Sequence, residues 1–228
     1  MPSVRIRIVS LVPSVTETLR AWNRDPIACT RFCEQPDLLH VGGTKDPDVA
    51  KIIELRPDLV VVDAEENRRE DHDAMVGSGL EVLALHVRSV DDVRPALATM
   101  AARLEVDWLA PELGDPSAQR LRAFVPIWRR PWMALGIPTY GASLLARHGV
   151  GNIFDDRGAY PTVSLAEAAQ REPDVVLAPS EPYPFTERQL PELAGVAPTV
   201  FVDGKDLFWW GVRTPGALAR LGEVLAEL

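Results

Sequence analysis

The chain has 228 residues, of which 46% are hydrophobic, and this length suffices for one large domain or two lobes of ordinary size. Its 33 acidic and 24 basic residues give a formal net charge of -9, and no cluster of Lys and Arg is interleaved with aromatic residues, which excludes a nucleic-acid-binding protein of the usual kind. The only cysteines, Cys29 and Cys33, exclude a disulfide framework and fit a reducing compartment.

The amino-terminal stretch is predicted to be a strand and not a secretion signal. Val4, Ile6 and Ile8 alternate with Arg5 and Arg7, and no basic region is followed there by a longer apolar core. The sequence therefore predicts a cytoplasmic protein. No apolar run approaches the ~20 residues that a membrane span requires.

Strands and helices are predicted to alternate through the first lobe. Ser14 is expected to cap the first helix, and the apolar run after Pro57 is typical of a strand buried on both faces of a parallel sheet. The expected strands are 5–12, 26–32, 58–64 and 81–87, and the expected helices are 14–22, 47–57 and 69–79.

The alternation stops after residue 88. Apolar side chains recur at helical spacing over residues 89–106, and Pro95 should bend this helix or mark its start. Asp115 and Pro116 are expected to open a further short helix.

The second half repeats the first. Residues 51–65 and 167–181 share a helix, a Pro-Asp break, an apolar strand and a final glutamate. We therefore expect an α/β fold with two Rossmann-like lobes, each with a parallel sheet, joined by a helical backbone, with a ligand cleft between the lobes at the carboxyl ends of the strands. The expected domains are an N-terminal α/β lobe (1–88), a helical linker (89–123) and a C-terminal α/β lobe (124–228).

An ordered set of segments carries a family resemblance that covers nearly the whole chain. The segments are TRFCEQPD, VGGTKDPD, RPDLVVVDAEENRRED, VPIWRRPWM, TYGASLLARHGVGNIF, YPTVSLAEA, PDVVLAPSEPYPF and DGKDLFWWGVRT. Together they resemble the helical-backbone substrate-binding proteins of cobalamin and iron-siderophore uptake, a periplasmic-binding-protein-like family. The greatest similarity is to its cobalamin-binding branch, also called helical backbone metal receptors.

The resemblance implies a binding protein and not an enzyme. It implies a metal chelate held between two lobes, either a corrinoid such as cobalamin or a ferric siderophore, with no built-in cofactor. An ABC permease is the membrane partner that the resemblance implies. We expect a monomer with little hinge motion, because a helix between two lobes bends less readily than loops.

The alternative function is a cytosolic chelatase-like or corrinoid-handling enzyme, because metal chelatases share this fold. The chain lacks the GxSxG, Walker A, GxGxxG and HExxH motifs of the common catalytic classes, and this absence favours a receptor.

Aromatic side chains recur where strands are expected to end, and a large, flat chelate requires aromatic walls. Neighbouring residues of an extended segment point to opposite sides, so Trp209 and not Trp210 is expected to face the ligand. The aromatic candidates for ligand binding are Phe32, Trp128, Trp132, Tyr140, Tyr183, Phe185, Phe208 and Trp209.

Cys33 and Glu34 are candidates because a thiolate and a carboxylate could form a pair of metal ligands. No further Cys or His lies at zinc-finger spacing, so we expect no metal site built from protein ligands alone. Axial coordination of a bound chelate by Cys33, His40 or His86 stays open.

The other polar candidates for ligand binding are Glu65, Asn67, Glu181 and Arg213. Glu65 and Glu181 occupy equivalent places in the repeat. In the resembling proteins, acidic residues of each lobe dock onto the permease; the alternative is a solvated face. Arg213 could bind a carboxylate or phosphate of the ligand, or pair with Asp203 or Asp206.

The segment SEPYPF, residues 180–185, is expected to form a preorganised rim. Proline fixes φ, and an extended segment sends Tyr183 and Phe185 to the same side, where both rings could stack on a ligand. Replacing both rings by Ala should then weaken binding by roughly 2 to 4 kcal/mol and barely change stability.

Overall fold

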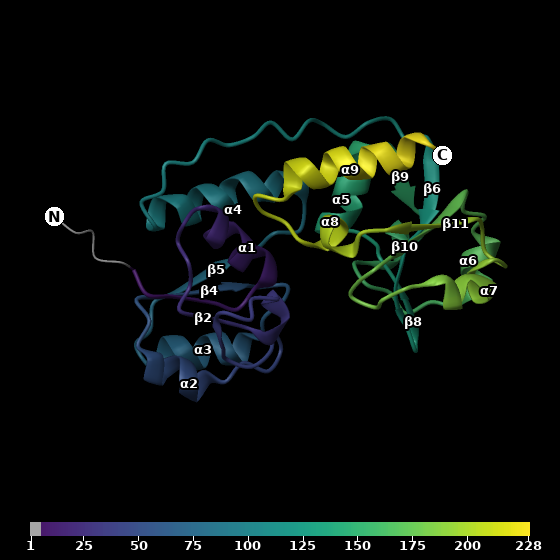
Figure 1. The fold of residues 1–228 in the computed structure, drawn as a ribbon. Helices are drawn as coiled ribbons and strands as arrows, with labels where there is room; N and C mark the ends of the chain where they lie inside the picture. The colour runs from purple at the N-terminus through teal and green to yellow at the C-terminus, as the bar shows by residue number, and fades with distance from the viewer. Residues whose placement is uncertain (1–5) are drawn as a thin grey trace. The chain divides into compact units, whose positions relative to one another are not determined.

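The computed structural model describes residues 6–228, and the chain in it divides into two compact units (Figure 1). Each unit has its own parallel sheet, which confirms the predicted α/β architecture of two Rossmann-like lobes. The chain enters each unit more than once. Unit 1 comprises Met1–Val87, Asp92–Pro111 and Trp210–Arg213, and unit 2 comprises Arg88–Asp91, Glu112–Trp209 and Thr214–Leu228.

The sheet of unit 1 has the strand order β3-β2-β1-β4-β5, and all neighbouring strands are parallel. Val9 in the central strand pairs with Ala28 on one side and with Val60 on the other. Residue 5, the start of the expected first strand, lies outside the described residues. The strands are β1 (Ile8–Ser10), β2 (Ala28–Cys29), β3 (Leu39–His40), β4 (Leu59–Asp63) and β5 (Val82–Leu85).

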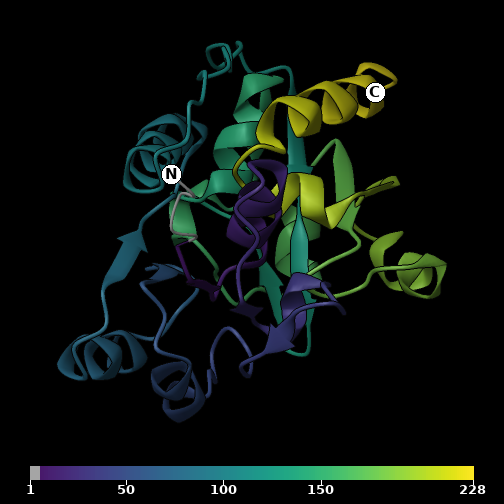
Figure 2. The same ribbon diagram turned by 60° about the vertical axis from the view of Figure 1, so that its left-hand side comes forward.

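The first helix of unit 1 begins one residue earlier than the sequence predicts. Pro13 occupies its first turn with φ already fixed by the ring, and Val12 is the N-cap, so the capping role expected for Ser14 is wrong. The α-helices are α1 (Pro13–Ala21), α2 (Val49–Leu55), α3 (Arg69–Gly77) and α4 (Val90–Arg103), with a 3-10 turn η1 (Arg31–Cys33). Figures 1 and 2 both show α2 and α3 side by side along the same face of this sheet.

The sheet of unit 2 has the strand order β11-β10-β6-β9, again with parallel neighbours. An antiparallel hairpin, β7–β8, directly follows β6. The strands are β6 (Leu121–Phe124), β7 (Pro126–Arg129), β8 (Trp132–Ala134), β9 (Val150–Asn152), β10 (Val175–Pro179) and β11 (Thr199–Val202).

Three helices of unit 2 begin with side-chain caps that the sequence supplies. Thr139 accepts a hydrogen bond from the backbone N–H of Ala142, Ser164 accepts one from Glu167, and Asp203 accepts one from Lys205. The α-helices are α5 (Tyr140–Arg147), α6 (Leu165–Gln170), α7 (Leu190–Leu193), α8 (Gly204–Phe208) and α9 (Thr214–Ala226), and the 3-10 turns are η2 (Asp155–Arg157) and η3 (Glu187–Gln189).

The two sheets confirm the internal repeat. In unit 1 the strands run β1-β4-β5 from the centre to one edge, and in unit 2 they run β6-β10-β11 in the same way. The strands β4 and β10, which the repeat predicted to be equivalent, are each five residues long and buried throughout. Continuous apolar strands of this kind are covered on both faces of a parallel sheet.

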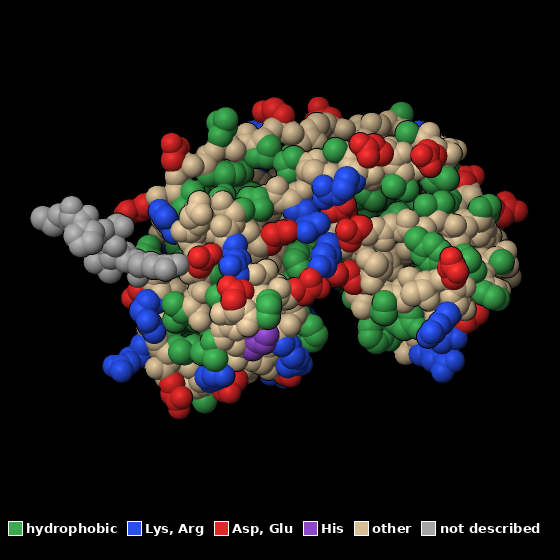
Figure 3. All heavy atoms as spheres, in the orientation of Figure 1, with side chains coloured by type: hydrophobic (Ala, Val, Ile, Leu, Met, Phe, Trp, Pro, Cys, Tyr) green, Lys and Arg blue, Asp and Glu red, His purple; other side chains and the backbone are tan. Residues whose placement is uncertain are grey.

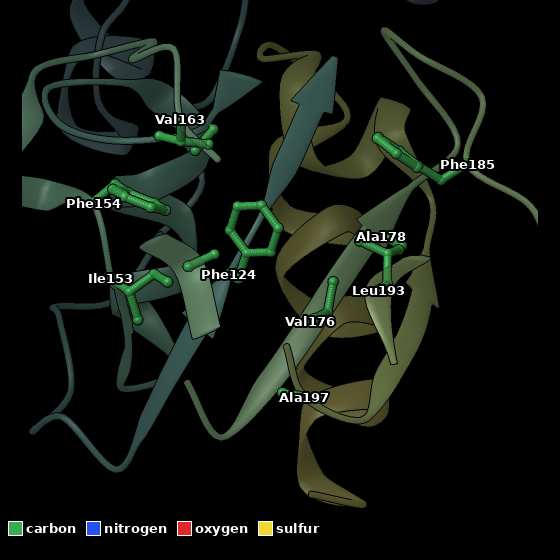
Figure 4. Packing of buried hydrophobic residues seen from close by; sticks show 11 residues of the cluster. Phe124, Ile153, Phe154, Val163, Val176, Ala178, Phe185, Leu193 and Ala197 are labelled. Carbon is green, nitrogen blue, oxygen red and sulfur yellow. The ribbon is translucent and has the colours of Figure 1, made fainter. Parts of the chain in front are cut away.

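Each unit has its own hydrophobic core. In unit 1, Val60 and Val62 of β4 pack with Ile52 of α2 and Met75 of α3. In unit 2, the core includes Phe124, Phe154, Val176, Ala178, Phe185 and Leu193 (Figure 4).

The segment between the repeats differs in part from the prediction. Helix α4 runs from Val90 through Pro95 as one element and does not begin at the proline. The short helix expected at Asp115 is wrong, because residues 106–120 form neither helix nor strand. Backbone N–H groups there bond to other parts of unit 2 instead: Ser117 donates to Ala146 and Arg120 donates to Gly149.

Among residues 6–228, no helix is both long and apolar enough to cross a bilayer. On the face drawn in Figure 3, acidic and basic side chains are interspersed without a continuous basic patch.

Candidate functional site

Four of the aromatic candidates meet in unit 2 and form what we call the aromatic cluster: Trp128, Trp132, Tyr183 and Phe185. The ring centroids of Tyr183 and Phe185 are 4.8 Å apart. The ring of Trp132 is stacked on Phe185, and the ring of Trp128 meets Tyr183 edge to face at 5.8 Å. The sequence thus identified four residues, from two separate segments, that the fold brings into contact.

The aromatic cluster lies beyond the carboxyl ends of β6 and β10. Trp128 and Trp132 belong to the hairpin β7–β8 that follows β6, and Tyr183 and Phe185 belong to the loop that follows β10. Ligands of open α/β sheets bind at this end of the strands. The position of the cluster therefore suits a binding surface.

The loop after β10 is fixed by hydrogen bonds on both sides of its rings. The backbone N–H of Phe185 donates to the carbonyl of Pro179 at 3.3 Å. Thr186 and Gln189 then form a reciprocal capping box at the start of η3. The loop is thus held in place by hydrogen bonds of the protein itself, and such preordering lowers the entropy lost when a loop binds a ligand.

The members of the aromatic cluster differ in exposure. Trp128 is 44% exposed, Trp132 and Tyr183 are half-buried, and Phe185 is only 4% exposed. Figure 4 shows the ring of Phe185 near Ala178 and Leu193 in the core of unit 2. Trp128 and Tyr183 can therefore reach a ligand, whereas Phe185 supports them from below.

A hollow of about 660 Å³ adjoins the cluster. Its lining residues are Tyr183, Pro184, Thr186, Glu187, Arg188 and Gln189. A volume of this size falls within the range of about 300–1,000 Å³ that is usual for ligand sites. Next to it, Arg129 of β7 forms a two-point ion pair with Glu192 of α7.

Glu181 and Trp209 contact each other in unit 2. The indole Nε1 of Trp209 donates to Oε2 of Glu181 at 2.9 Å, and the ammonium group of Lys205 lies 5.0 Å from the centroid of the Trp209 ring. Phe208, the last residue of α8, directly precedes Trp209 in the sequence and is half-buried. Trp210 is 3% exposed and Trp209 is half-buried, so Trp209 is the more accessible of the adjacent pair.

Tyr140 is placed in the interior of unit 2. It is 5% exposed, and its hydroxyl is hydrogen-bonded to Thr214 at 3.0 Å. Because it begins α5 and ends in this buried contact, its local role is to join α5 to the start of α9.

In unit 1, Glu65 and Asn67 follow the carboxyl end of β4. Asn67 joins three loops: its Oδ1 accepts from Asp63 N, and its Nδ2 donates to the carbonyls of Leu11 and Thr44. Glu65 is half-buried, and its Oε1 lies 2.9 Å from Nε2 of His86. Asn67 thus holds the rim of unit 1 together.

Asp63 is a buried carboxyl group that the sequence analysis did not single out. It is 1% exposed, its Oδ1 accepts from the backbone N–H of Glu65, and its Oδ2 is buried without a hydrogen-bond partner. Burial raises the pKa of this carboxyl to about 6. The only signal in the sequence was an acidic residue that ends an apolar strand.

Phe32, Cys33 and Glu34 lie in the turn after β2 and differ in exposure. Phe32 is 51% exposed under the guanidinium of Arg31, Glu34 is exposed in a left-handed conformation, and Cys33 is 1% exposed. Cys33 and Glu34 are therefore not arranged as a pair of ligands. In residues 6–228, no group of three or more His, Cys, Asp or Glu side chains is placed to hold a metal ion.

Arg213 binds a carboxylate of the protein that the sequence analysis did not consider. Its Nε and Nη2 donate to the two carboxylate oxygens of Glu17 at 2.9 and 2.6 Å, both within unit 1. Asp206, one of the expected partners, is instead bound by Arg220.

No family model matches the chain. A curated vitamin B12-binding protein from Pectobacterium carotovorum is 23% identical over 97% of this chain and 88% of its own length. A periplasmic heme-binding protein, BhuT, solved with two hemes, superimposes with a TM-score of 0.78 at 23% identity, covering 97% of this chain and 98% of its own. The periplasmic vitamin B12-binding protein BtuF of Vibrio cholerae has a TM-score of 0.74 at 18% identity, covering 96% of each chain.

These similarities correct the expected location. The cytoplasmic prediction is wrong, because solved proteins with this fold, among them BtuF and the heme-binding HutB of Vibrio cholerae, are periplasmic. The amino-terminal pattern on which that prediction depended describes only a strand of the folded protein.

Proposed function

We propose that this chain is a non-catalytic receptor for a metal chelate, of the helical-backbone periplasmic-binding-protein-like family. Its fold and its sequence similarity along nearly its whole length support this proposal. The ligand is taken up and released intact. A periplasmic location is part of this proposal, and so is an ABC permease as the membrane partner.

The observation that carries the proposal is the aromatic cluster of unit 2. Trp128 and Tyr183 present apolar rings beyond the carboxyl ends of the strands, and the rings are held by a hairpin and a hydrogen-bonded loop. Aromatic rings bind a flat, amphipathic ligand by stacking and by burial of apolar area. A tetrapyrrole-type macrocycle fits this surface, and we propose a corrinoid as the preferred ligand.

Polar groups beside the cluster suit the periphery of such a ligand. Arg188 and Glu187 line the adjoining hollow of unit 2, and both are exposed. Corrinoids carry amide groups and a phosphate at their periphery, and an exposed guanidinium can bind the latter in a two-point manner. We assign Arg188 this anchoring role.

We also propose that Glu65 and Glu181 contribute to docking on the permease. They occupy equivalent positions after β4 and β10, the matching strands of the two sheets. Each carboxylate has a neighbour in its own unit, His86 for Glu65 and Trp209 for Glu181, that restricts its rotation. A preordered acidic side chain loses less entropy when it pairs with a basic partner.

A thermal-shift series with cobalamin, haem and a ferric siderophore tests the proposal. A ligand that binds only the folded protein stabilises it by RT ln(1 + [L]/Kd), about 2.7 kcal/mol at one hundred times Kd. We expect cobalamin to raise the melting temperature most. A shift with haem or with the siderophore alone would replace the corrinoid by that class, and no shift with any of the three would contradict the receptor.

The binding surface is tested by Trp128→Ala and Tyr183→Ala, with Tyr160→Ala as the matched control. Tyr160 is 46% exposed, close to the value of Trp128, and lies outside the aromatic cluster. Each cluster variant should weaken binding roughly 30-fold, which corresponds to the loss of about 2 kcal/mol of buried ring contact. An unchanged affinity in both variants, or an equal loss in Tyr160→Ala, would refute the surface.

Incubation with a metal-free tetrapyrrole and a divalent metal separates the receptor from the chelatase. A receptor leaves the tetrapyrrole metal-free, and the absorption spectrum does not change. Catalytic insertion of the metal would favour the enzyme.

A further inference from the structure

A second cavity of unit 2, with a volume of about 360 Å³, adjoins the edge strand β9. Its walls come from the segment before α4, from α5 and the loop that precedes it, and from residues 117–119. All of these belong to unit 2, and none of the lining residues also lines the hollow beside the aromatic cluster. The cavity is therefore a separate candidate for a ligand site, and its volume falls within the usual range of about 300–1,000 Å³.

Hydrogen bonds of the protein hold the walls of this cavity in place. The backbone N–H of Val90 donates to the hydroxyl of Ser143 at 2.8 Å, which ties the start of α4 to α5. The backbone N–H of Ser117 donates to the carbonyl of Ala146 at 3.0 Å, which ties the segment before β6 to the same helix. Walls that are ordered before binding lower the entropy lost when a ligand enters.

The lining contains a carboxylate oxygen that the protein leaves without a donor. Oδ1 of Asp155 is buried and has no hydrogen-bond partner among residues 6–228. The hydroxyls of Thr139 and Ser143 also belong to the lining, but they donate to the carbonyls of Gly136 and Tyr140. Burial raises the pKa of Asp155, as expected for a carboxyl group short of donors. A buried oxygen of this kind costs free energy until a donor reaches it.

The cavity has one charged side chain of each sign in its lining, Arg88 and Asp155. A guanidinium group has five N–H donors, so Arg88 can bind a carboxylate in a two-point manner and still keep contacts within the protein. The carboxylate of Asp155 accepts hydrogen bonds from an ammonium group in the same way. Opposite charges in one cavity are complementary to a ligand that carries both an anionic and a cationic group.

Apolar side chains complete the lining and lead from the interior of the unit to its surface. Ala142 is 7% exposed, whereas Ile137 is 47% exposed. A short hydrocarbon group can bury apolar area against them. We propose that this cavity binds a small α-amino acid with an apolar side chain, whose ammonium group donates to Asp155 and whose carboxylate accepts from Arg88. This site is additional to the chelate site and does not depend on it.

Calorimetric titration of the full chain with L-valine tests the proposal, with no chelate present. Isobutylamine and isovalerate are the controls, because they keep the hydrocarbon skeleton of valine but lack its carboxylate and its ammonium group, respectively. We expect saturable binding of valine and at least roughly tenfold weaker binding of either control, since each leaves one charged group of the cavity without its partner. Absence of saturable binding at millimolar valine would overturn the site. Equal affinity for valine and for either control would overturn the two-charge recognition.

Variants locate the bound amino acid. Asp155→Asn should weaken valine binding roughly tenfold or more and leave cobalamin binding unchanged. Asp156→Asn is the matched control, because this neighbouring carboxylate is exposed, lies outside the lining and pairs with Arg171. Wild-type affinity for valine in Asp155→Asn, or an equal loss in Asp156→Asn, would overturn the proposal. Trp128→Ala should bind valine like the wild type, and a loss there would place valine at the aromatic cluster instead.

Discussion

The rings of Trp132 and Phe185 are stacked, with centroids 5.9 Å apart and planes inclined by only 12°. Trp132 belongs to the hairpin β7–β8, and Phe185 to the loop after β10. Because Phe185 is part of the core of unit 2, the stack fixes the more exposed aromatic residues to a rigid support. We therefore expect stability to depend on Phe185 and any ligand contact to depend on the more exposed members of the cluster.

Phe185→Ala is expected to destabilise the protein. Removing a buried phenylalanine leaves a cavity and costs about 3–5 kcal/mol, and Phe185 is 4% exposed. Trp128→Ala, at 44% exposure, should change the free energy of unfolding by less than about 1 kcal/mol. Urea denaturation measures both. Equal losses in the two variants would contradict the division of roles, and a stable Phe185→Ala would restore the sequence-based expectation that both rings of SEPYPF can be removed without cost.

Asp63→Asn is expected to change how stability depends on pH. Burial raises the pKa of Asp63 from 3.8 to about 6, so the folded protein binds more protons than the unfolded chain between these values. The contribution of protonated Asp63 to the free energy of unfolding is present below about pH 4 and is lost as the pH rises through about 6. The variant should match the wild type near pH 4 and exceed it at pH 7.5, by on the order of 3 kcal/mol.

Urea denaturation across this pH range measures the free energy of unfolding of the wild type and of Asp63→Asn. The difference between the two cancels the pH dependence that the other carboxylates contribute to both. Asp107→Asn, at an exposed position, is the control and should show no such difference. A parallel pair of pH profiles for the wild type and Asp63→Asn would show that Asp63 does not titrate in this window.

Gly204→Ala should disturb the position of Glu181. A Cβ atom at Gly204 would lie 2.7 Å from the Glu181 carbonyl and also meet its backbone nitrogen, so backbone atoms would have to move. Overpacking of this kind costs about 1–3 kcal/mol. Gly195→Ala is the matched control, because a Cβ there meets no atom within 4 Å. Equal melting temperatures for the two variants would show that the backbone at Glu181 shifts at little cost in stability.

Arg213 and Glu17 are expected to be energetically coupled. Their two-point ion pair is partly buried, with 19% and 32% of the side chains exposed. A double-mutant cycle with Arg213→Ala and Glu17→Ala should give a coupling energy of about 1–2 kcal/mol. If Arg213 instead serves the ligand, Arg213→Ala will weaken cobalamin binding more than Glu17→Ala does, and the coupling in the unliganded protein will be near zero.

The sequence predicted best what short-range patterns determine. The buried strands β4 and β10 follow from continuous apolar runs, and their repeated context predicted two similar sheets. Four aromatic residues of the cluster were identified because rings at strand exits are unusual in a purely structural role. Trp132 and Phe185 meet because β6 and β10 are neighbours in the sheet.

The sequence could not predict what distant partners determine. Arg213 and Glu17 are 196 positions apart, so no local pattern joins them. Asp115 and Pro116 satisfy the local rules for a helix start, yet Ser117 bonds to the carbonyl of Ala146, a partner that only the folded chain supplies. Whether a carboxyl such as Asp63 is buried also depends on the whole lobe.

Unit 1 contains a short segment, Trp210–Arg213, that is separated in the sequence from the rest of this unit by Glu112–Trp209 of unit 2. Most of this unit is synthesised first, but Glu17 has no Arg213 to pair with until nearly two hundred further residues have been made. At about 5–20 residues per second, this interval lasts on the order of ten seconds or more. The nascent amino-terminal lobe is thus incomplete until Trp210–Arg213 has been made, and a chain that stops before Trp210 lacks part of both units.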